Sequence, residues 1–344
     1  MINASGTRRS FLRHAAAAAA VVGVPMGTVR AQTVLKLATA LPPGSSVYKS
    51  FEWWVKAVND AGQGEVQLQP MHGYAYASPA NVYERTVNGV ADVGFVLLAA
   101  TGKPFPRTSV SQLPGTGDDG EAISVALWRL YAKGLLADEF NEVKLINIQA
   151  TPVNGLLAKE PVRKMADLRG QKVRVIDKIT GDAMAALGGT PLSVPYSEAY
   201  QAISRGVMTA SIANPYAVSA FKLGEVAKHF TDSVSFGTAP LVTLMNKQSY
   251  ERLSPRGRAV IDRFSGEESS RTAGRAHIEN AAGMVNDLKS RGELTVHALP
   301  ADEVAAWQKA LQPVAASWAA ATPDGRKVLD AYLAEYASAK SQKK

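Results

Sequence analysis

The chain has 344 residues, of which 46% are hydrophobic, and a formal net charge of +8. This composition is typical of a globular protein rather than a disordered one. Cysteine is absent and the five histidines show no ligand spacing, which argues against structural zinc, thiolate metal sites and cysteine nucleophiles. No dense basic run carries interleaved aromatic residues. We therefore expect no nucleic-acid partner, no metal and no cofactor.

The first 31 residues have the pattern of an export signal. Arg8 and Arg9 form a basic start, an Ala/Val-rich stretch runs from 15 to 24, and residues 29–31 (VRA) resemble a cleavage site. The apolar stretch is too short to span about 30 Å of hydrocarbon. The segment TRRSFL is typical of the twin-arginine route. We expect cleavage after residue 31, a periplasmic location, and a mature charge of about +4 once the four arginines of the signal are lost.

The mature chain is longer than one compact core usually requires, so we expect two lobes. Its first part has the order β-α-β-α-β of a parallel α/β unit. Strands are predicted at 34–40, 65–70 and 91–99. One helix is capped by Ser45 or Ser46 and ends at Gly62, and another opens at Ser78-Pro79 and ends at Gly89.

A second α/β unit follows residue 144. Strands are predicted at 145–149, 155–158, 172–176 and 207–213, with helices at 181–187 and from a Ser197 cap to Gly206. One or two long helices are expected from 254 to about 291, and two shorter ones at 302–311 and 323–337. The Lys-rich end AKSQKK is expected to be a solvated tail. Ligands of such folds bind in crevices at the carboxyl ends of the strands.

Short motifs of enzymes are present only in part. Residues 115–120 match G-x-G-x-x-G, but Asp118 and Asp119 would repel a pyrophosphate, so an acidic surface loop is the better interpretation. Residues 46–49 match S-x-x-K without the accompanying motifs, which makes Ser46 a helix cap. Neither a nucleophile–base pair nor a metal cluster is apparent. We therefore expect no enzymatic activity, and a periplasmic enzyme is the weaker alternative.

Five segments, in order along the chain, resemble the DctP-type solute-binding subunits of TRAP transporters. They are LKLATALPPGSSVYKSFEWW, then YERTVNGVADVGF with FPRTSVSQLP, DLRGQKVRV (167–175), LGGTPLSVPYSEAYQAISRGV (187–207) and LMNKQSYERLSPRGRAVI. The resemblance implies a two-lobed periplasmic binding protein of the type II-like α/β class, with a long bridging helix and C-terminal helices. Lobe I would comprise residues 32–151 plus 239–279, and lobe II residues 152–238 plus 280–344.

The same resemblance implies a function. Such a subunit is a monomer that captures a small organic acid, closes over its carboxylate and delivers it to the membrane subunits of a TRAP permease. Sequence alone leaves open a binding subunit that serves another transporter or a sensor, because closure of two lobes would look the same in each case.

Arg174 falls on the family's characteristic ligand position, an arginine that pairs with a substrate carboxylate. The chemistry of the residue agrees with this role. An arginine near the end of the strand 172–176, flanked by valines, would lie at the rim of an apolar crevice. Its planar fork can hold a carboxylate through two hydrogen bonds. The alternative is an arginine paired with a nearby acid such as Asp177 or Glu198.

Other positions of the family's site carry over less directly. Tyr196 matches an aromatic residue that stacks on the ligand, Asp177 matches a polar contact of some members, and Asn214 lies one position from an asparagine contact. Asn154 stands where sialic-acid-binding relatives have a second arginine. Those relatives also carry charged residues where this chain has the apolar stretch 96–100, and an acid where it has Thr209.

The scarcity of charged partners predicts a ligand less polar than a sugar acid. We expect one carboxylate to be held by Arg174, with Trp53, Tyr74, Tyr76 or Phe236 covering an apolar part. The adjacent indole of Trp54 would point about 100° away from that of Trp53 on a helix, so at least one of the two is expected in the core. An aryl carboxylate or a branched oxo-acid fits these expectations, and a C4-dicarboxylate is the alternative.

Overall fold

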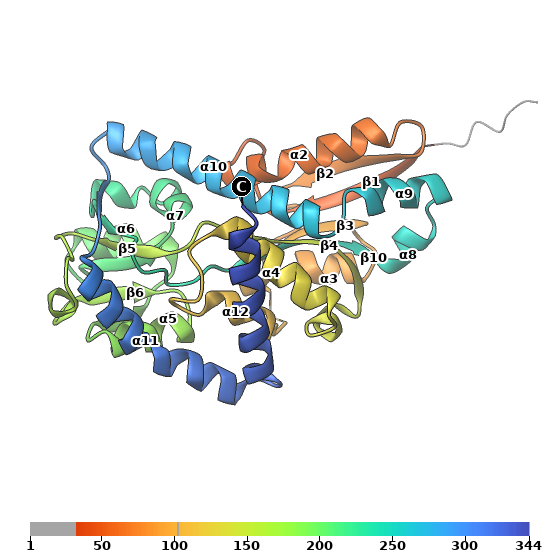
Figure 1. The fold of residues 1–344 in the computed structure, drawn as a ribbon. Coiled ribbons are helices and arrows are strands. Elements are labelled where there is room, and N and C mark those ends of the chain that lie inside the picture. Colours follow the sequence, from red (N-terminus) through yellow and green to blue (C-terminus); the bar gives the residue numbers. More distant parts are fainter. Residues whose placement is uncertain (1–31, 102, 344) are drawn as a thin grey trace, which may run out of the picture.

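The computed structural model describes residues 32–101 and 103–343 of the chain and divides them into two α/β lobes (Figure 1). The predicted export signal and its cleavage site lie outside the described residues. Within the described part, none of the helices combines the length and the apolar character that a membrane crossing requires.

The first lobe is built on a five-stranded sheet in the order β2-β1-β3-β10-β4. Strands β1, β2 and β3 run parallel to one another, and β10 runs antiparallel to β3 and β4. The strands are β1 (Thr33–Thr39), β2 (Val66–His72), β3 (Val93–Leu97), β4 (Val143–Ala150) and β10 (Pro240–Asn246). The helices are α2 (Ser46–Ala61), α3 (Val82–Val87), α4 (Gly120–Ala132), α8 (Lys247–Glu251) and α9 (Pro255–Arg263).

Local sequence explains where α2 begins and ends. The side chain of Ser45 accepts a hydrogen bond from the Tyr48 amide, so Ser45 and not Ser46 is the cap, and the helix ends at Gly62. Phe51, Trp54 and Val58 form its buried face. The indole of Trp54 donates to the Phe264 carbonyl at 2.7 Å, which satisfies its one polar atom inside the core.

One helix of the first lobe begins later than predicted. The helix expected from Ser78 begins only at Val82, because residues 78–81 form a turn in which the Asn81 side chain accepts from the Ser78 amide. The acidic loop predicted at 115–120 is present over residues 115–119, and it leads into α4: Asp119 accepts from the Ala122 amide as the N-cap of that helix. The sequence reading also missed α4 and β10 altogether.

The second lobe is built on a six-stranded sheet in the order β11-β9-β5-β8-β6-β7. Strands β6, β7 and β8 run parallel, and β5 runs antiparallel to β8 and β9. The strands are β5 (Gly155–Ala158), β6 (Lys172–Val175), β7 (Thr190–Ser193), β8 (Ala210–Ala213), β9 (His229–Thr231) and β11 (Thr295–His297). The helices are α5 (Lys178–Ala186), α6 (Tyr196–Ser204) and α7 (Pro215–Ala220).

Several boundaries in this lobe differ from those predicted. Helix α5 begins at Lys178 and not at Gly181. Helix α6 begins at Tyr196, immediately after Pro195, so Ser197 lies inside the first turn and does not cap the helix. Strand β8 begins at Ala210 and not at Val207, whose amide still bonds to the Ala202 carbonyl in the turn that ends α6. Helix α7 and strands β7, β9 and β11 were not predicted.

Two extended segments carry the chain between the lobes, one from β4 to β5 and the other from β9 to β10. They are bonded to each other, since the hydroxyls of Thr151 and Thr238 lie 2.7 Å apart. Gly237 has a φ of 75° and packs so closely that an added Cβ would lie 2.2 Å from the Gln112 carbonyl oxygen. Only glycine fits this crossing without strain.

Helix α10 (Glu267–Ser290) spans both lobes, as the bridging helix of the prediction should (Figure 1). Its first half packs against α4 and β4 of the first lobe, and its later part packs against α7, with Leu288 in the second lobe's core. At Gly274, α10 approaches α4 so closely that an added Cβ would lie 2.5 Å from Ser124 Oγ.

The C-terminal helices divide between the lobes, which corrects the assignment of 280–344 to lobe II. Helix α11 (Ala301–Ala321) buries Trp307 and Leu311 in the second lobe, but Trp318 reaches the first lobe's core. Helix α12 (Gly325–Ser341) packs on α4 of the first lobe. The Lys-rich end is exposed from Lys340 to Lys343, as expected, but it is not a free tail: α12 continues to Ser341, Lys340 pairs with Asp118 at 2.6 Å and Lys343 with Asp119 at 2.5 Å.

Candidate functional site

Three strand-to-helix junctions lie together at one edge of the second sheet. Strands β6, β7 and β8 run parallel, so their carboxyl ends meet there, and each leads directly into α5, α6 or α7. Strand β5 starts at the same edge, because Gly155 pairs with Ala213. The crossing segment that comes from the first lobe therefore arrives where these three helices begin, which is the position at which α/β folds bind ligands.

Arg174 on β6 occupies this edge and is only 4% exposed. Its Nε donates to the Val194 carbonyl at 2.7 Å and Nη1 to the Ile212 carbonyl at 3.4 Å. Burial lowers the pKa of the guanidinium. Neither Asp177 nor Glu198 forms an ion pair with it, and no other acidic side chain of the described residues does so. The structure therefore holds a buried cation that only dipoles and an aromatic face neutralise.

Tyr196 supplies that aromatic face. The guanidinium carbon of Arg174 lies 3.4 Å from the centroid of its ring, and Phe221 stacks on the ring at 5.1 Å with an interplanar angle of 10°. The hydroxyl of Tyr196 donates to the Ile212 carbonyl at 3.3 Å. Burial raises the pKa of this phenol, so Tyr196 stays neutral. Cation–π stacking and two carbonyl bonds together hold the Arg174 fork in one orientation.

The other polar residues predicted for the site also gather at this edge, but each has a structural task. Asp177 caps α5 by accepting from the Thr180 amide, and Asn214 caps α7 by accepting from the Ala217 amide. The Asn154 side chain donates to the Gly237 carbonyl at 2.9 Å and so ties the two crossing segments together. These three side chains position the edge of the sheet, whatever further contacts they make.

The aromatic residues predicted to cover the ligand are dispersed instead. Phe236 is 1% exposed and packs against Trp307 in the second core, so it is a core residue. Trp53 packs on the core of the first lobe, and Tyr76 packs there while it donates to the Val90 carbonyl. Tyr74 is 73% exposed. Among the described residues, no hydrogen bond or ring contact links these four to Arg174 or Tyr196.

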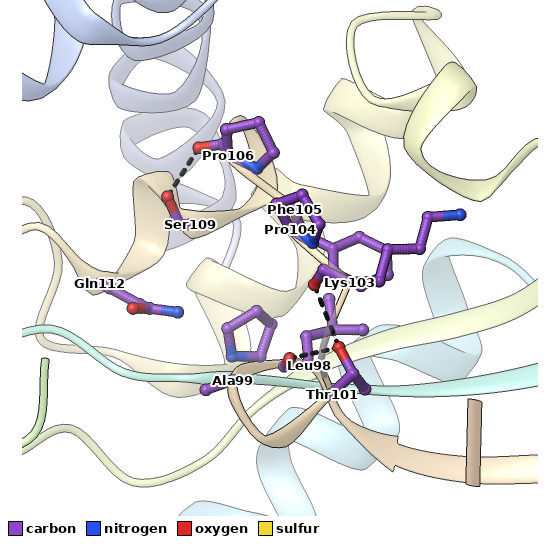
Figure 2. Close-up of a pocket in the computed structure, with 10 residues that line it drawn as sticks. Leu98, Ala99, Thr101, Lys103, Pro104, Phe105, Pro106, Ser109 and Gln112 are labelled. Atoms are coloured by element: carbon purple, nitrogen blue, oxygen red, sulfur yellow. Dashed lines mark hydrogen bonds between the residues drawn. The ribbon is translucent and has the colours of Figure 1, made fainter. Parts of the chain in front are cut away.

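The sequence reading missed a cavity of about 280 Å³ in the first lobe. It opens where β3 ends and is lined by Leu98, Ala99, Thr101, Lys103, Pro104, Phe105, Pro106, Ser109, Gln112 and Pro240. Figure 2 shows Gln112 at one end of the cavity and the Lys103 side chain at the other, with Phe105 between them. Lys103 pairs with Glu142, so its charge is already balanced. The only hint in the sequence was the apolar stretch 96–100.

The cavity adjoins the crossing segments. Pro240 is the first residue of β10, and the Ser111 hydroxyl, next to Gln112, donates to the Thr238 carbonyl at 3.0 Å. From the second lobe, Ile179 in the first turn of α5 packs against the cores of both lobes. Ile179 therefore brings the first turn of α5 against the first lobe's core, to which the cavity residues Leu98 and Phe105 also belong.

Comparison with known families gives one extended match. The model of the bacterial extracellular solute-binding proteins, family 7 (DctP), matches residues 37–322. Among individual relatives, the chain is 31% identical to the C4-dicarboxylate-binding periplasmic protein DctP of Rhodobacter capsulatus, over 57% of this chain and 56% of that protein.

Solved structures resemble the fold over nearly its whole described length. A TRAP solute-binding protein from Rhodoferax ferrireducens T118, in complex with copurified benzoate, aligns with a TM-score of 0.79 and 26% identity, covering 90% of this chain and 99% of that one. A TRAP periplasmic solute-binding protein from Bordetella bronchiseptica, with bound (R)- and (S)-mandelate, aligns with a TM-score of 0.75 and 26% identity, covering 89% and 99%.

Proposed function

The chain belongs to family 7 of the bacterial extracellular solute-binding proteins, and we propose that it captures a small aromatic carboxylate and delivers it to a TRAP permease. It is an extracytoplasmic receptor for small organic acids of the kind that serves TRAP transporters. The family and its solved neighbours are binding receptors rather than enzymes, and we propose no catalytic role.

The observation that carries the proposal is the buried Arg174 without an acidic partner. Burying an unpaired charge is costly, so such a group is retained where a ligand supplies the missing charge. The Nε and Nη1 atoms are occupied by carbonyl oxygens, which leaves the rest of the fork for a carboxylate. An ammonium could not be held by stacking and carbonyl bonds in the same way.

The proposed aromatic part of the ligand follows from the first lobe. Its cavity is walled mainly by Leu98, Ala99, Phe105 and prolines, and its polar members Ser109 and Gln112 are uncharged. Such a wall favours an apolar group and offers no second cation for a second carboxylate, since Lys103 is paired with Glu142. The benzoate and mandelate of the two solved neighbours have this combination of one carboxylate and one ring.

We propose that capture proceeds by hinge closure at the two crossing segments. The carboxylate meets Arg174 on the second lobe, and the first lobe then covers the ring and expels water. Loss of water lowers the local dielectric constant and strengthens the ion pair. The hydrogen bonds at Thr151–Thr238 and Asn154–Gly237 keep the crossing segments together during this movement.

A C4-dicarboxylate is the second candidate, favoured by the name of the R. capsulatus relative. A thermal-shift panel of benzoate, mandelate, succinate and galacturonate separates the two. We expect benzoate and mandelate to raise the melting temperature most, since a ligand that binds only the folded state stabilises it by mass action. If only succinate or only galacturonate stabilises the protein, the aromatic assignment is wrong.

Export and partners complete the proposal. We propose that residues 1–31 direct the chain through the twin-arginine route and that it acts as a monomer. Replacing Arg8 and Arg9 with lysines should retain the precursor in the cytoplasm, whereas a signal of the general secretion route would tolerate the change. A gene for a TRAP permease beside that of this chain would favour delivery over a sensor role.

A further inference from the structure

A chain of buried hydrogen bonds connects the two lobes beside α10. Ser50 on α2 belongs to the first lobe, and Tyr216 on α7 belongs to the second. Their hydroxyl oxygens lie 3.1 Å apart. The Tyr216 hydroxyl also lies 3.1 Å from Nδ1 of His277 on α10, and Nε2 of His277 lies 3.0 Å from Oε1 of Gln149 on β4. Ser50, Tyr216, His277 and Gln149 are all buried.

The donor and the acceptor of each hydrogen bond in this network follow from the residues that form it. The Gln149 amide nitrogen donates to Asn147 at 2.9 Å, so Oε1 faces His277 and must accept from Nε2–H. A neutral His277 then has a free acceptor at Nδ1, to which the Tyr216 hydroxyl donates. Ser50 donates in turn to the Tyr216 oxygen, while Ser50 accepts from the Asn280 amide at 3.1 Å. Every polar hydrogen along this series of hydrogen bonds has a partner.

Within this hydrogen-bond network, Ser50–Tyr216 is the bond that joins α2 of the first lobe directly to α7 of the second. Tyr216 also reaches the first lobe indirectly, through His277 to Gln149 on β4. The other links of Tyr216 go to α10, which spans both lobes. A movement of one lobe against the other must therefore stretch this bond unless α2 and α7 move together. Tyr216 is also only two residues from Asn214, the cap of α7 at the edge that carries Arg174. In the same arrangement Ile179 brings that edge against the first lobe's core.

We propose that the Ser50–Tyr216 hydrogen bond is a latch between the lobes and that Tyr216 is a positioning residue for ligand capture. The latch favours the arrangement in which the Arg174 edge meets the first lobe, without contact between Tyr216 and the ligand. The inference rests on the proposed function, because a latch acts on affinity only if capture requires closure. The apparent affinity falls in proportion to the population of the competent arrangement.

The test uses Tyr216→Phe, Ser50→Ala and the double variant of the whole chain. Benzoate affinity is measured by calorimetry, and the radius of gyration by small-angle X-ray scattering with and without saturating benzoate. We expect each single variant to bind about tenfold more weakly and to be more expanded without ligand, as loss of one buried hydrogen bond allows. The double variant should bind no more weakly than Tyr216→Phe alone, because that variant already removes the Ser50–Tyr216 bond.

Tyr48→Phe is the matched control. It removes a phenolic hydroxyl from the same helix α2, and the described residues offer that hydroxyl no hydrogen bond across the lobes. Affinity and radius of gyration should match those of the unaltered protein. Ser50→Ala, a small change, keeps the test decisive should Tyr216→Phe not fold.

Two results would overturn the latch. Lower melting temperatures with unchanged benzoate affinity and radius of gyration would mean that the network merely satisfies buried polar groups. Additive losses in the double variant would mean that Ser50 and Tyr216 act separately. Both results leave the proposed function intact. If the unaltered protein binds benzoate without any compaction, closure itself is wrong and the latch fails with it.

Discussion

The two lobes contribute opposite chemistry to the proposed site. On the second lobe, Arg174 and Tyr196 lie at the ends of parallel strands and are held by carbonyl bonds and stacking. On the first lobe, the cavity is walled by a loop of apolar side chains and prolines after β3. In the proposed site, charge would be recognised by a residue on regular structure, which holds the guanidinium in one orientation. Ligand shape would be recognised by a loop, which can vary in sequence without disturbing a sheet.

The lobes also differ in how they are reinforced. The first lobe is reinforced by a cluster of charges centred on Glu121, whose side chain is 5% exposed and whose partners come from α10 and from Lys343, just after α12. Arg275 donates to Glu121 twice at 3.1 Å, and Arg271 and Lys343 lie 3.4 Å away. Of the helices that follow α10, α12 packs on the first lobe, and Lys343 just after it joins this cluster. The second lobe depends on the apolar contacts of α11.

The largest expected effect comes from replacing Arg174, the charged residue of the second lobe. Arg174→Ala should weaken benzoate binding by about 2–5 kcal/mol, because the ligand carboxylate loses its buried partner. Arg174→Lys should also weaken it, since an ammonium cannot form the fork. Calorimetry measures both. Arg205→Ala, an exposed arginine that ends α6 in the same lobe, is the control and should bind normally. Unchanged affinity in either Arg174 variant would remove Arg174 from the site.

A second test concerns His277, which belongs to the hydrogen-bond network between the lobes. Burial lowers the pKa of His277 to about 3. His277 has an ordinary pKa of about 6.5 in the unfolded chain, so the unfolded chain takes up a proton first as the pH falls. The contribution of His277 to the free energy of unfolding is therefore full above about pH 6.5 and is lost as the pH falls toward about 3. Between pH 7 and pH 5 this loss amounts to about 2 kcal/mol.

Urea unfolding at several pH values measures this effect. His277→Gln should have a flatter pH dependence than the unaltered protein between pH 7 and 5. The pKa of His297 is also lowered, but it contributes equally to both proteins. Glu121 and Glu267 have lowered pKa values, so they destabilise the fold only at more acidic pH. Equal slopes in the two proteins would show that His277 is not the titrating group.

A third test concerns Glu121 and the ion pairs that reinforce the first lobe. Glu121→Gln should lower the free energy of unfolding by about 1–2 kcal/mol, because Arg275, Arg271 and Lys343 lose a buried counter-charge. The matched change Glu268→Gln affects a side chain that is 80% exposed and should cost less than about 0.5 kcal/mol. Chemical denaturation measures both. Equal losses would mean that burial of Glu121 adds nothing to its ion pairs.

The smallest expected effect comes from filling the apolar cavity of the first lobe. Ala99 lines the cavity and is exposed, so Ala99→Phe should fill part of the space and weaken benzoate about fivefold. Ala305→Phe, at an exposed position on α11, adds the same ring elsewhere and should leave affinity unchanged. Calorimetry again decides. Tighter or equal binding by the Ala99 variant would place the ring of the ligand outside this cavity.

Regular elements with clear local signals were predictable. Ser45 and Gly62 bound α2 as expected, β5 has the predicted ends, and the two helices between 254 and 291 are present as α9 and α10. The family resemblance was also correct. Arg174 was identified because it combines a strand end with a recognisable motif, although its role as ligand partner stays a prediction.

Errors concentrate where distant segments decide the outcome. Residues 115–119 form the loop that the sequence predicts, but the sequence does not show that Asp119 caps α4 and pairs with Lys343, more than 200 residues away in the chain. Phe236 looked available for a ligand, but the arrival of Trp307 from α11 buries it. Local patterns contain no information about such partners, because each contact exists only after the chain has folded.

By itself, the sequence determined the class of the fold, its main helices and strands, and the cation at the end of β6, because caps, periodicity and turn residues act over a few neighbouring positions. Tertiary structure alone decided that Arg174 has Tyr196 and carbonyl oxygens as neighbours instead of an acid, that a cavity opens after β3, and that α12 returns to the first lobe. These features depend on which surfaces meet, and burial and charge balance are properties of the packed chain.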